Sequence, residues 1–220
     1  MSLIVLVASP SYDTATRYTY HYKKLLAEKL VTEGKAVIWL GERYSPDVFR
    51  DFSCASDVIV AAGHGAPNKF TGYNGELIWD PDTLGCVRNR GVHLLSCLTG
   101  QNLGKEIVRK GGKWFIGYKE EFVFVSDKSK RIHEDELARP FFEIDNLIDE
   151  RILLHKWSPK RAYEFAKKKY SELGEKFLEI NTEVSSWLFW NGENLVFYER
   201  GKERFIDKII RAIRRGIFEM

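Results

Sequence analysis

Val58-Ile59-Val60-Ala61-Ala62-Gly63-His64-Gly65 is the stretch that decides the fold of this 220-residue chain. Five apolar residues in a row, the first three of them β-branched, are typical of a strand buried on both faces, as the strands of parallel sheets are. Glycines at 63 and 65 then enclose a histidine. A second, mainly apolar run, Val92-His93-Leu94-Leu95-Ser96, leads into Cys97 in the same way. The sequence therefore predicts two buried strands, each with a reactive side chain at its carboxyl end.

The rest of the first 125 residues repeats this rhythm of buried strand and covering helix. Short apolar runs predict further strands at 3–8, 35–40 and 113–117. Between the first two, apolar residues recur at helical spacing, which leaves the polar faces of that helix to Lys23, Lys24, Glu28 and Lys29. Shorter helices are expected at 46–52 and 102–110. Strands that alternate with helices in this way form a parallel sheet covered on both faces.

The pattern changes after Phe122. Residues 122–125 are expected to form one more strand or an extended lid, and helices are predicted at 141–154 and 159–179. Asn191-Gly192 is predicted as a turn between two apolar runs, and an isoleucine-rich stripe in 202–218 predicts a last helix. We therefore expect an α/β fold with a three-layer α/β/α core at 1–125, whose mostly parallel sheet has about five to six strands. We expect a helix-rich part at 126–220 to pack on this core, and the helices of that part are a candidate surface for a protein partner.

Composition and charge exclude several classes of protein. With 34 Lys and Arg against 31 Asp and Glu, the net charge of +3 is too small to predict a nucleic-acid partner. No stretch approaches the ~20 consecutive apolar residues that a membrane-spanning helix needs. The three cysteines, at 54, 86 and 97, are odd in number and lack the spacing of a disulfide framework or a metal finger. From these features we expect a cytoplasmic protein in a reducing compartment.

His64 and Cys97 form the constellation that carries chemistry. Carboxyl ends of neighbouring parallel strands lie at one edge of the sheet, where α/β proteins bind ligands. A thiol and an imidazole placed there indicate nucleophilic catalysis, in which an imidazolium lowers the pKa of the thiol. The N–H groups of Gly65 and Cys97 are candidate donors for an oxyanion, since a glycine lets the backbone approach a substrate closely.

These residues carry a family resemblance. An apolar strand that ends in Gly63-His64-Gly65, a second that ends in Ser96-Cys97, and the run 113–118 resemble the clan CD cysteine peptidases, above all their gingipain and CHAT-like branches. The resemblance covers about residues 1–125 and implies a caspase-like sheet. The Gln-Ala-Cys-x-Gly signature of caspases is missing, because Ser96 precedes Cys97, so aspartate specificity is not implied.

The resemblance implies a thiol protease, a cysteine endopeptidase that hydrolyses peptide bonds in a protein or peptide substrate. Cys97 then attacks the carbonyl, His64 transfers the proton, and Gly65 helps to hold the oxyanion. The acidic residues in the segments that wall the family's pocket are candidates for substrate binding and suggest cleavage after Lys or Arg; they are Asp13, Glu120 and Glu121. The resemblance implies neither a cofactor nor a metal.

Other interpretations stay open on the sequence alone. Cys97 alone is most simply a small core residue, and His93 lies within a strand pattern typical of packing. The fold also suits a catalytically inactive caspase-like scaffold, a flavodoxin-like module that binds a small ligand, or an enzyme that acts on a non-peptide acyl group. A zinc site drawn from the cysteines and histidines lacks ligand pairs with metal-finger spacing.

Overall fold

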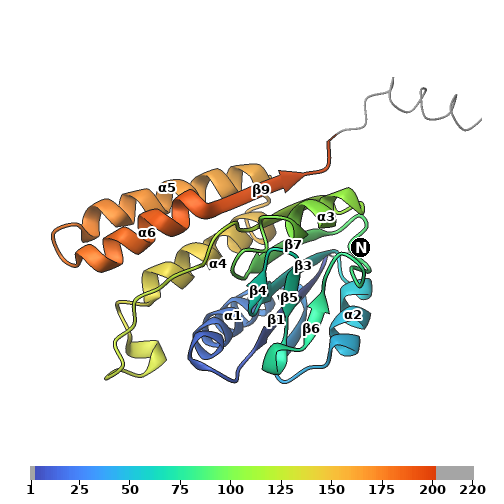
Figure 1. Cartoon of the computed structure of the whole chain (residues 1–220), viewed down its shortest axis with the longest axis horizontal. Helices are drawn as coiled ribbons and strands as arrows, with labels where there is room; N and C mark the ends of the chain where they lie inside the picture. Colours follow the sequence, from blue (N-terminus) through green and yellow to red (C-terminus); the bar gives the residue numbers. More distant parts are fainter. Residues whose placement is uncertain (1–2, 202–220) are drawn as a thin grey trace, which may run out of the picture.

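A six-stranded sheet organises the molecule, for which a computed structural model describes residues 3–201 (Figure 1). The strand order is β2-β1-β3-β7-β8-β9, and every pair is parallel except β8 with β9. The strands are β1 (Ile4–Pro10), β2 (Ala36–Glu42), β3 (Val58–Ala62), β7 (Gly91–Leu95), β8 (Trp114–Tyr118) and β9 (Leu195–Glu199). The predicted mostly parallel α/β sheet is confirmed, and all five strands expected before residue 118 are present.

Helices cover both faces of this sheet because alternate residues of its strands point to opposite sides. On one face, α1 (Thr14–Thr32) and α4 (Arg139–Leu153) pack on Val5, Val60 and Ile116. On the other, α2 (Pro46–Ala55) and α3 (Leu103–Arg109) contribute side chains to a second core around Leu6, Ile59 and Phe115. The two separate cores make this a three-layer α/β/α arrangement.

The connection from β3 to β7 contains a small antiparallel sheet, and a disulfide ties it to α2. The sheet consists of β4 (Gly65–Ala66), β5 (Lys69–Thr71) and β6 (Leu77–Trp79), with a 3-10 turn η1 (Tyr73–Gly75) between the last two. Cys54, in α2, is bonded to Cys86, with 4.8 Å between the two Cα atoms. The expectation that the chain has no disulfide was therefore wrong, because sequence spacing does not show which cysteines the fold brings together. The argument for a reducing compartment, which depended on free cysteines, falls with it.

The C-terminal part extends the same sheet. After the 3-10 turn η2 (Ile132–Glu134) and α4, helices α5 (Pro159–Phe177) and α6 (Thr182–Asn194) lie side by side and lead into β9, which pairs with β8 (Figure 1). The turn predicted at Asn191-Gly192 was wrong, since both residues lie in α6. Their tertiary contacts favour the helix: the Asn191 side chain bonds to the backbone N–H and C=O of Val123, and Gly192 is close to Tyr170.

Two further sequence predictions concern this half of the chain. Residues 122–125 belong to neither a helix nor a strand, so the strand considered there is absent. The helix predicted at 202–218 lies outside the described residues. Among residues 3–201, no helix is long and apolar enough to cross a membrane.

Candidate functional site

The carboxyl ends of β3 and β7 bring His64 and Cys97 to one cavity. The two strands are paired in parallel, with Ala62 opposite Leu95, and the Gly63 N–H donates to the Leu95 carbonyl 3.3 Å away. The strand ends therefore lie level, and the residues that follow them share one edge of the sheet. A cavity of about 80 Å³ lies there; its lining residues are Ala15, Thr16, Thr19, Gly63, His64, Leu95, Ser96, Cys97, Phe122 and Phe124.

A tight turn presents Cys97 at this edge. Leu98, directly after it, has a φ of +63°, a left-handed conformation that is uncommon for a branched side chain. Hydrogen bonds on both sides hold the turn: the Leu98 N–H donates to the Glu120 carbonyl at 3.1 Å, and the Thr99 hydroxyl donates to the Ser96 carbonyl at 3.1 Å. The chain thus reverses immediately after β7 and leaves the Cys97 side chain partly exposed.

Gly65 brings the backbone of the His64 loop against the backbone of Cys97. A Cβ built on Gly65 would lie 2.5 Å from the Cys97 carbonyl oxygen and would also collide with the Ser96 hydroxyl. A Cβ on Gly63 would collide with the Thr71 carbonyl. Both collisions involve backbone carbonyls that cannot easily move, so glycine is required at 65 for the approach of the two loops and at 63 for the close contact with β5.

Asp13 holds the imidazole of His64. The Oδ2 atom of Asp13 lies 2.6 Å from His64 Nε2, while Oδ1 accepts the Thr16 N–H at 2.8 Å. Asp13 is thereby the N-cap of α1 and a hydrogen-bond partner of the histidine at once. Burial raises the pKa of Asp13, but the hydrogen bonds from Thr16 and His64 outweigh burial and leave the pKa below its usual value. The carboxylate that faces His64 is therefore negatively charged.

The surroundings of Cys97 hold its thiol in the protonated form. Burial raises its pKa, and the negative charge of Glu121 acts in the same direction. The backbone N–H groups of Phe122 and of Cys97 itself lower the pKa but do not compensate. The net shift is upward, whereas the sequence led us to expect a lowered pKa. The sequence suggested a lid at 122–125, and Phe122 and Phe124 do line the cavity with Cys97, but the effect of burial on the thiol pKa was not expected.

The remaining acidic candidates lie beside the site rather than in the cavity. Neither Glu120 nor Glu121 belongs to its lining within residues 3–201. Both residues use their backbone carbonyls to hold the segment in place: Glu120 accepts the Leu98 N–H, and Glu121 accepts the Trp190 indole N–H at 2.8 Å. The Glu121 side chain is exposed and Glu120 is half-buried. Asp13, the third candidate, faces His64.

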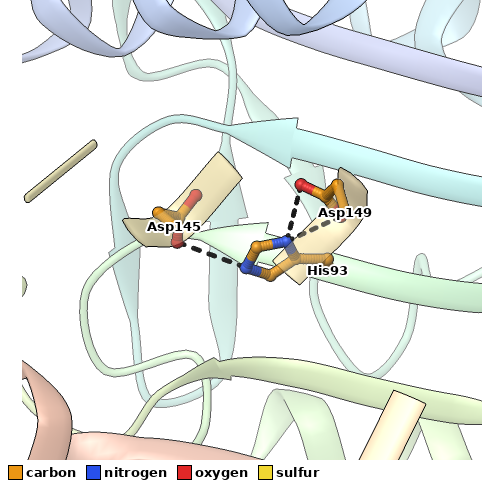
Figure 2. Close-up of side chains that lie close together, drawn as sticks. All are labelled: His93, Asp145 and Asp149. Atoms are coloured by element: carbon orange, nitrogen blue, oxygen red, sulfur yellow. Dashed lines mark hydrogen bonds and ion pairs between the residues drawn. The ribbon is translucent and has the colours of Figure 1, made fainter. Parts of the chain in front are cut away.

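A second polar cluster, which the sequence did not reveal, is buried beneath α4. His93 of β7 lies between Asp145 and Asp149 of that helix (Figure 2). His93 Nδ1 is 3.0 Å from both oxygens of Asp149, and Nε2 is 3.3 Å from Asp145 Oδ1. All three residues are buried, and a ligand atom from each lies within 4.8 Å of the others.

Lys23 of α1 supplies the cation for this cluster. Its Nζ lies 2.8 Å from Asp145 Oδ2 and 3.3 Å from Asp149 Oδ2, with none of its side chain exposed. Burial lowers the pKa of His93, but Asp149 and Asp145 outweigh burial and raise the pKa to about 9. Lys23 and His93 are then both charged and balance the two carboxylates. A metal ion would need a deprotonated His93 and would face the Lys23 ammonium, so the geometry favours an ionic quartet over a metal centre.

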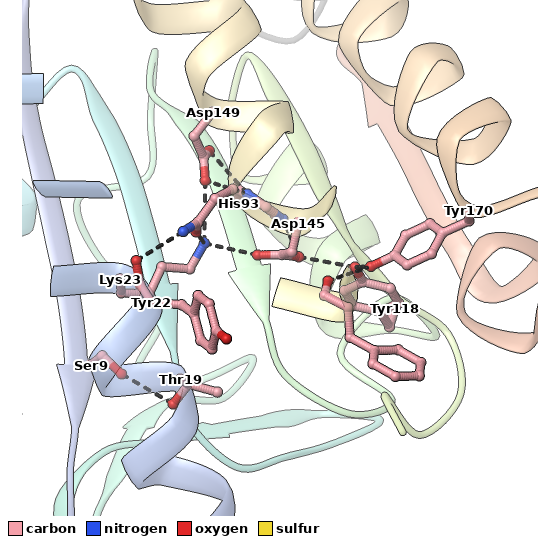
Figure 3. Close-up of polar contacts among 11 residues, drawn as sticks. Ser9, Thr19, Tyr22, Lys23, His93, Tyr118, Asp145, Asp149 and Tyr170 are labelled. Atoms are coloured by element: carbon pink, nitrogen blue, oxygen red, sulfur yellow. Dashed lines mark hydrogen bonds and ion pairs between the residues drawn. The ribbon is translucent and has the colours of Figure 1, made fainter. Parts of the chain in front are cut away.

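The ionic quartet, defined as Lys23, His93, Asp145 and Asp149, continues into two buried tyrosines. The Tyr118 hydroxyl donates to Asp145 Oδ1 at 2.9 Å and lies 3.0 Å from the Tyr170 hydroxyl (Figure 3). The network therefore joins residues of α1, β7, β8, α4 and α5. It is a polar connection between the sheet and the C-terminal helices rather than part of the cavity at Cys97.

Comparison with known proteins identifies the fold. No family model and no curated protein matches the sequence. Among solved structures, the chain is similar to the Arg-specific cysteine proteinase gingipain R, with a TM-score of 0.56 and 10% identity over 90% of this chain and 46% of that one. It is also similar to a complex of the pro- and mature domains of gingipain RgpB from Porphyromonas gingivalis, with a TM-score of 0.54 and 9% identity over 90% and 47% of the two chains.

This likeness shows a caspase-like α/β fold. At 10% identity it shows the fold alone, and the chain spans about half the length of these proteins. The resemblance seen in the two strand-end motifs therefore agrees with the whole-chain architecture.

Proposed function

We propose that this protein is a cysteine peptidase in which Cys97 is the nucleophile and His64 the general acid and base. The observation that carries the proposal is the shared cavity: a thiol and an imidazole from the ends of neighbouring strands line it together. The fold, which is that of a cysteine proteinase, gives independent support.

In the proposed reaction, the Cys97 thiol passes its proton to His64 while its sulfur attacks the carbonyl carbon of a peptide bond. The N–H groups of Gly65 and Cys97 donate to the oxyanion. His64 then gives the proton to the leaving nitrogen as the C–N bond breaks, which leaves a thioester on Cys97. Water, deprotonated by His64, hydrolyses the thioester and restores the thiol.

Asp13 acts in this scheme through His64. Because His64 Nε2 is engaged by Asp13, Nδ1 is the nitrogen left to exchange protons with Cys97 and the substrate. A carboxylate at Nε2 fixes this tautomer and stabilises the imidazolium that forms during the reaction. This geometry favours a positioning role for Asp13 over the substrate-binding role expected from the sequence.

The raised pKa of Cys97 supports one order of events in this scheme. Burial and the charge of Glu121 favour the protonated thiol in the free protein. In the proposed mechanism His64 therefore accepts the proton as the sulfur attacks, rather than from a preformed ion pair.

Digestion of a peptide library tests the proposal. Wild-type protein is compared with Cys97→Ala, His64→Ala and, as a matched control, His133→Ala, which changes a histidine exposed at the surface. We expect cleavage by the wild type, no cleavage by Cys97→Ala, a loss of ~10²-fold or more in His64→Ala, and full activity in His133→Ala. Cleavage that persists in Cys97→Ala would refute the proposed nucleophile. A wild type that cleaves nothing would favour an inactive scaffold or a ligand-binding module.

A further inference from the structure

We infer that the cavity beside Cys97 receives a small, uncharged side chain, from Ala to Val in size, on the residue whose carbonyl is attacked. This inference rests on the proposed peptidase function and specifies its substrate class. It replaces the preference for Lys or Arg that the acidic residues suggested in the sequence.

The size of the cavity sets how much of a side chain it can enclose. A cavity of ~150 Å³ in a protein core holds one benzene molecule, so a volume near half of that holds about three carbon atoms. The cavity here measures about 80 Å³ and is open on one side. It therefore encloses the whole of an alanine or valine side chain. A Lys or Arg side chain would extend out through the mouth and place its charged end outside the cavity.

The walls of the cavity offer no negative charge to a cationic side chain. Ala15, Leu95, Phe122 and Phe124 supply apolar surface, and within the described residues no lining residue is acidic. The polar part of the wall includes the Ser96 hydroxyl, which has no hydrogen-bond partner among residues 3–201, and this neutral group cannot balance the charge of a Lys or Arg side chain.

The two threonines of the lining are already satisfied. Thr16 Oγ1 accepts the Asp13 N–H at 2.9 Å and donates to Asp13 Oδ1 at 2.8 Å. Thr19 Oγ1 donates to the Thr16 carbonyl at 3.1 Å and lies 3.1 Å from the Ser9 hydroxyl. Their hydroxyls therefore stabilise the start of α1 and leave their methyl groups as the surface for an incoming side chain.

The position of the cavity connects it with the acyl side of the substrate. Cys97 belongs to its wall, and the acyl part of the substrate stays bonded to Cys97 until the thioester is hydrolysed. The side chain next to that carbonyl is thus the one held beside the sulfur. Glu121 lies outside this cavity and is exposed, so it meets only a side chain that extends past the mouth.

Peptidyl acyloxymethyl ketones test the inference, because they alkylate a thiol after recognition of the residue that precedes the reactive group. Cys97 is the one free thiol of the chain, so the mass of the intact protein reports its modification without reductant. Dipeptide reagents that end in Gly, Ala, Val, Arg, Lys or Asp are compared, with iodoacetamide as the reference for intrinsic reactivity. We expect the Ala and Val reagents to react at least ~10-fold faster than the Arg, Lys and Asp reagents.

Each other outcome contradicts a defined part of the reasoning. Faster reaction with Arg or Lys, or equal rates for all six reagents, overturns the inference but leaves the peptidase proposal in place. The same reagents are tested on His64→Ala. If iodoacetamide modifies Cys97 but every peptidyl reagent reacts equally fast with the wild type and with His64→Ala, both the inference and the proposed function fail.

A narrowed cavity supplies the matched test. Ala15→Val adds two methyl groups to the lining, and we expect it to slow the Val reagent ~10-fold relative to the Gly reagent, since about two buried carbons are lost. Lys24→Val, at an exposed position of the same helix, should leave this ratio at its wild-type value. As a second variant, Phe124→Leu widens the cavity and should speed a Leu reagent relative to Val. Unchanged ratios in Ala15→Val and Phe124→Leu overturn the inference.

Discussion

The charged His93 in the ionic quartet predicts a loss of stability with rising pH. Its pKa is about 9 in the folded protein, against 6.5 for an unperturbed histidine. The folded state therefore holds a proton that the unfolded state releases, and the resulting stabilisation is complete below pH 6.5 and lost as pH rises through 9. At ~1.4 kcal/mol per pH unit, the free energy of unfolding should fall by about 3 kcal/mol across this window.

Urea unfolding followed by tryptophan fluorescence measures this effect at pH 6.5, 7.5, 8.5 and 9, with the disulfide kept intact. We expect His93→Gln to have a lower free energy of unfolding than wild type at pH 6.5, because Lys23 alone then faces two carboxylates. The fall of this free energy between pH 6.5 and 9 that is due to His93 should be absent in the variant. His21→Gln is the control: burial lowers the pKa of His21, so its titration lies below the window and the wild-type slope should remain. A wild-type protein whose stability is flat from pH 6.5 to 9 would refute a charged His93.

Substitutions at Asp13, at Gly65 and at the disulfide probe the site and the fold. Asp13→Asn keeps the N-cap of α1 but removes the charge beside His64. We therefore expect its melting temperature to stay near wild type while the rate of peptide cleavage falls ~10-fold or more. Asp13→Ala also removes the N-cap, so its free energy of unfolding in urea should fall by ~1 kcal/mol as well. Gly65→Ala should slow alkylation of Cys97 by the Ala reagent at least ~10-fold relative to iodoacetamide, because its Cβ displaces the loop. Cys54→Ser with Cys86→Ser opens a loop with a sequence separation of 32 and should cost ~3 to 4 kcal/mol of unfolding free energy, whereas a change below ~1 kcal/mol would mean that the bridge does not restrain the unfolded chain.

The sheet and the placement of His64 and Cys97 could be predicted because they depend on local information. Wholly apolar runs identify strands buried on both faces, and the chain order places β3 beside β7. Glycines at 63 and 65 mark close approaches of the backbone; in the structure Gly65 lies against Ser96 and Cys97, and Gly63 lies against Thr71 of β5. The partner of His64 was less visible: Asp13 was noticed as an acidic residue near the site, but its second role as an N-cap is what fixes its carboxylate.

Features that depend on distant residues were not predictable from local patterns. Lys23 was assigned to the polar side of its helix, yet it is buried, because Asp145 and Asp149 of a helix more than 100 residues away neutralise it. Periodicity records which residues share a face but not which charged groups will meet there. The same limit applies to Asn191, whose turn propensity is overridden by its two hydrogen bonds to the backbone of Val123.

The ionic quartet also has a consequence for which fragments of this chain can fold alone. Two of its members, Lys23 and His93, belong to the first 125 residues, and both negative charges come from α4. A fragment that stops at residue 125 would lose α4 and with it both carboxylates, so Lys23 would have no counter-ion, His93 would lose the groups that keep it protonated, and β8 would become an unprotected edge. We therefore expect the first 125 residues not to fold on their own, and we expect a transplant of the cysteine and histidine loops into another scaffold to need the later helices as well.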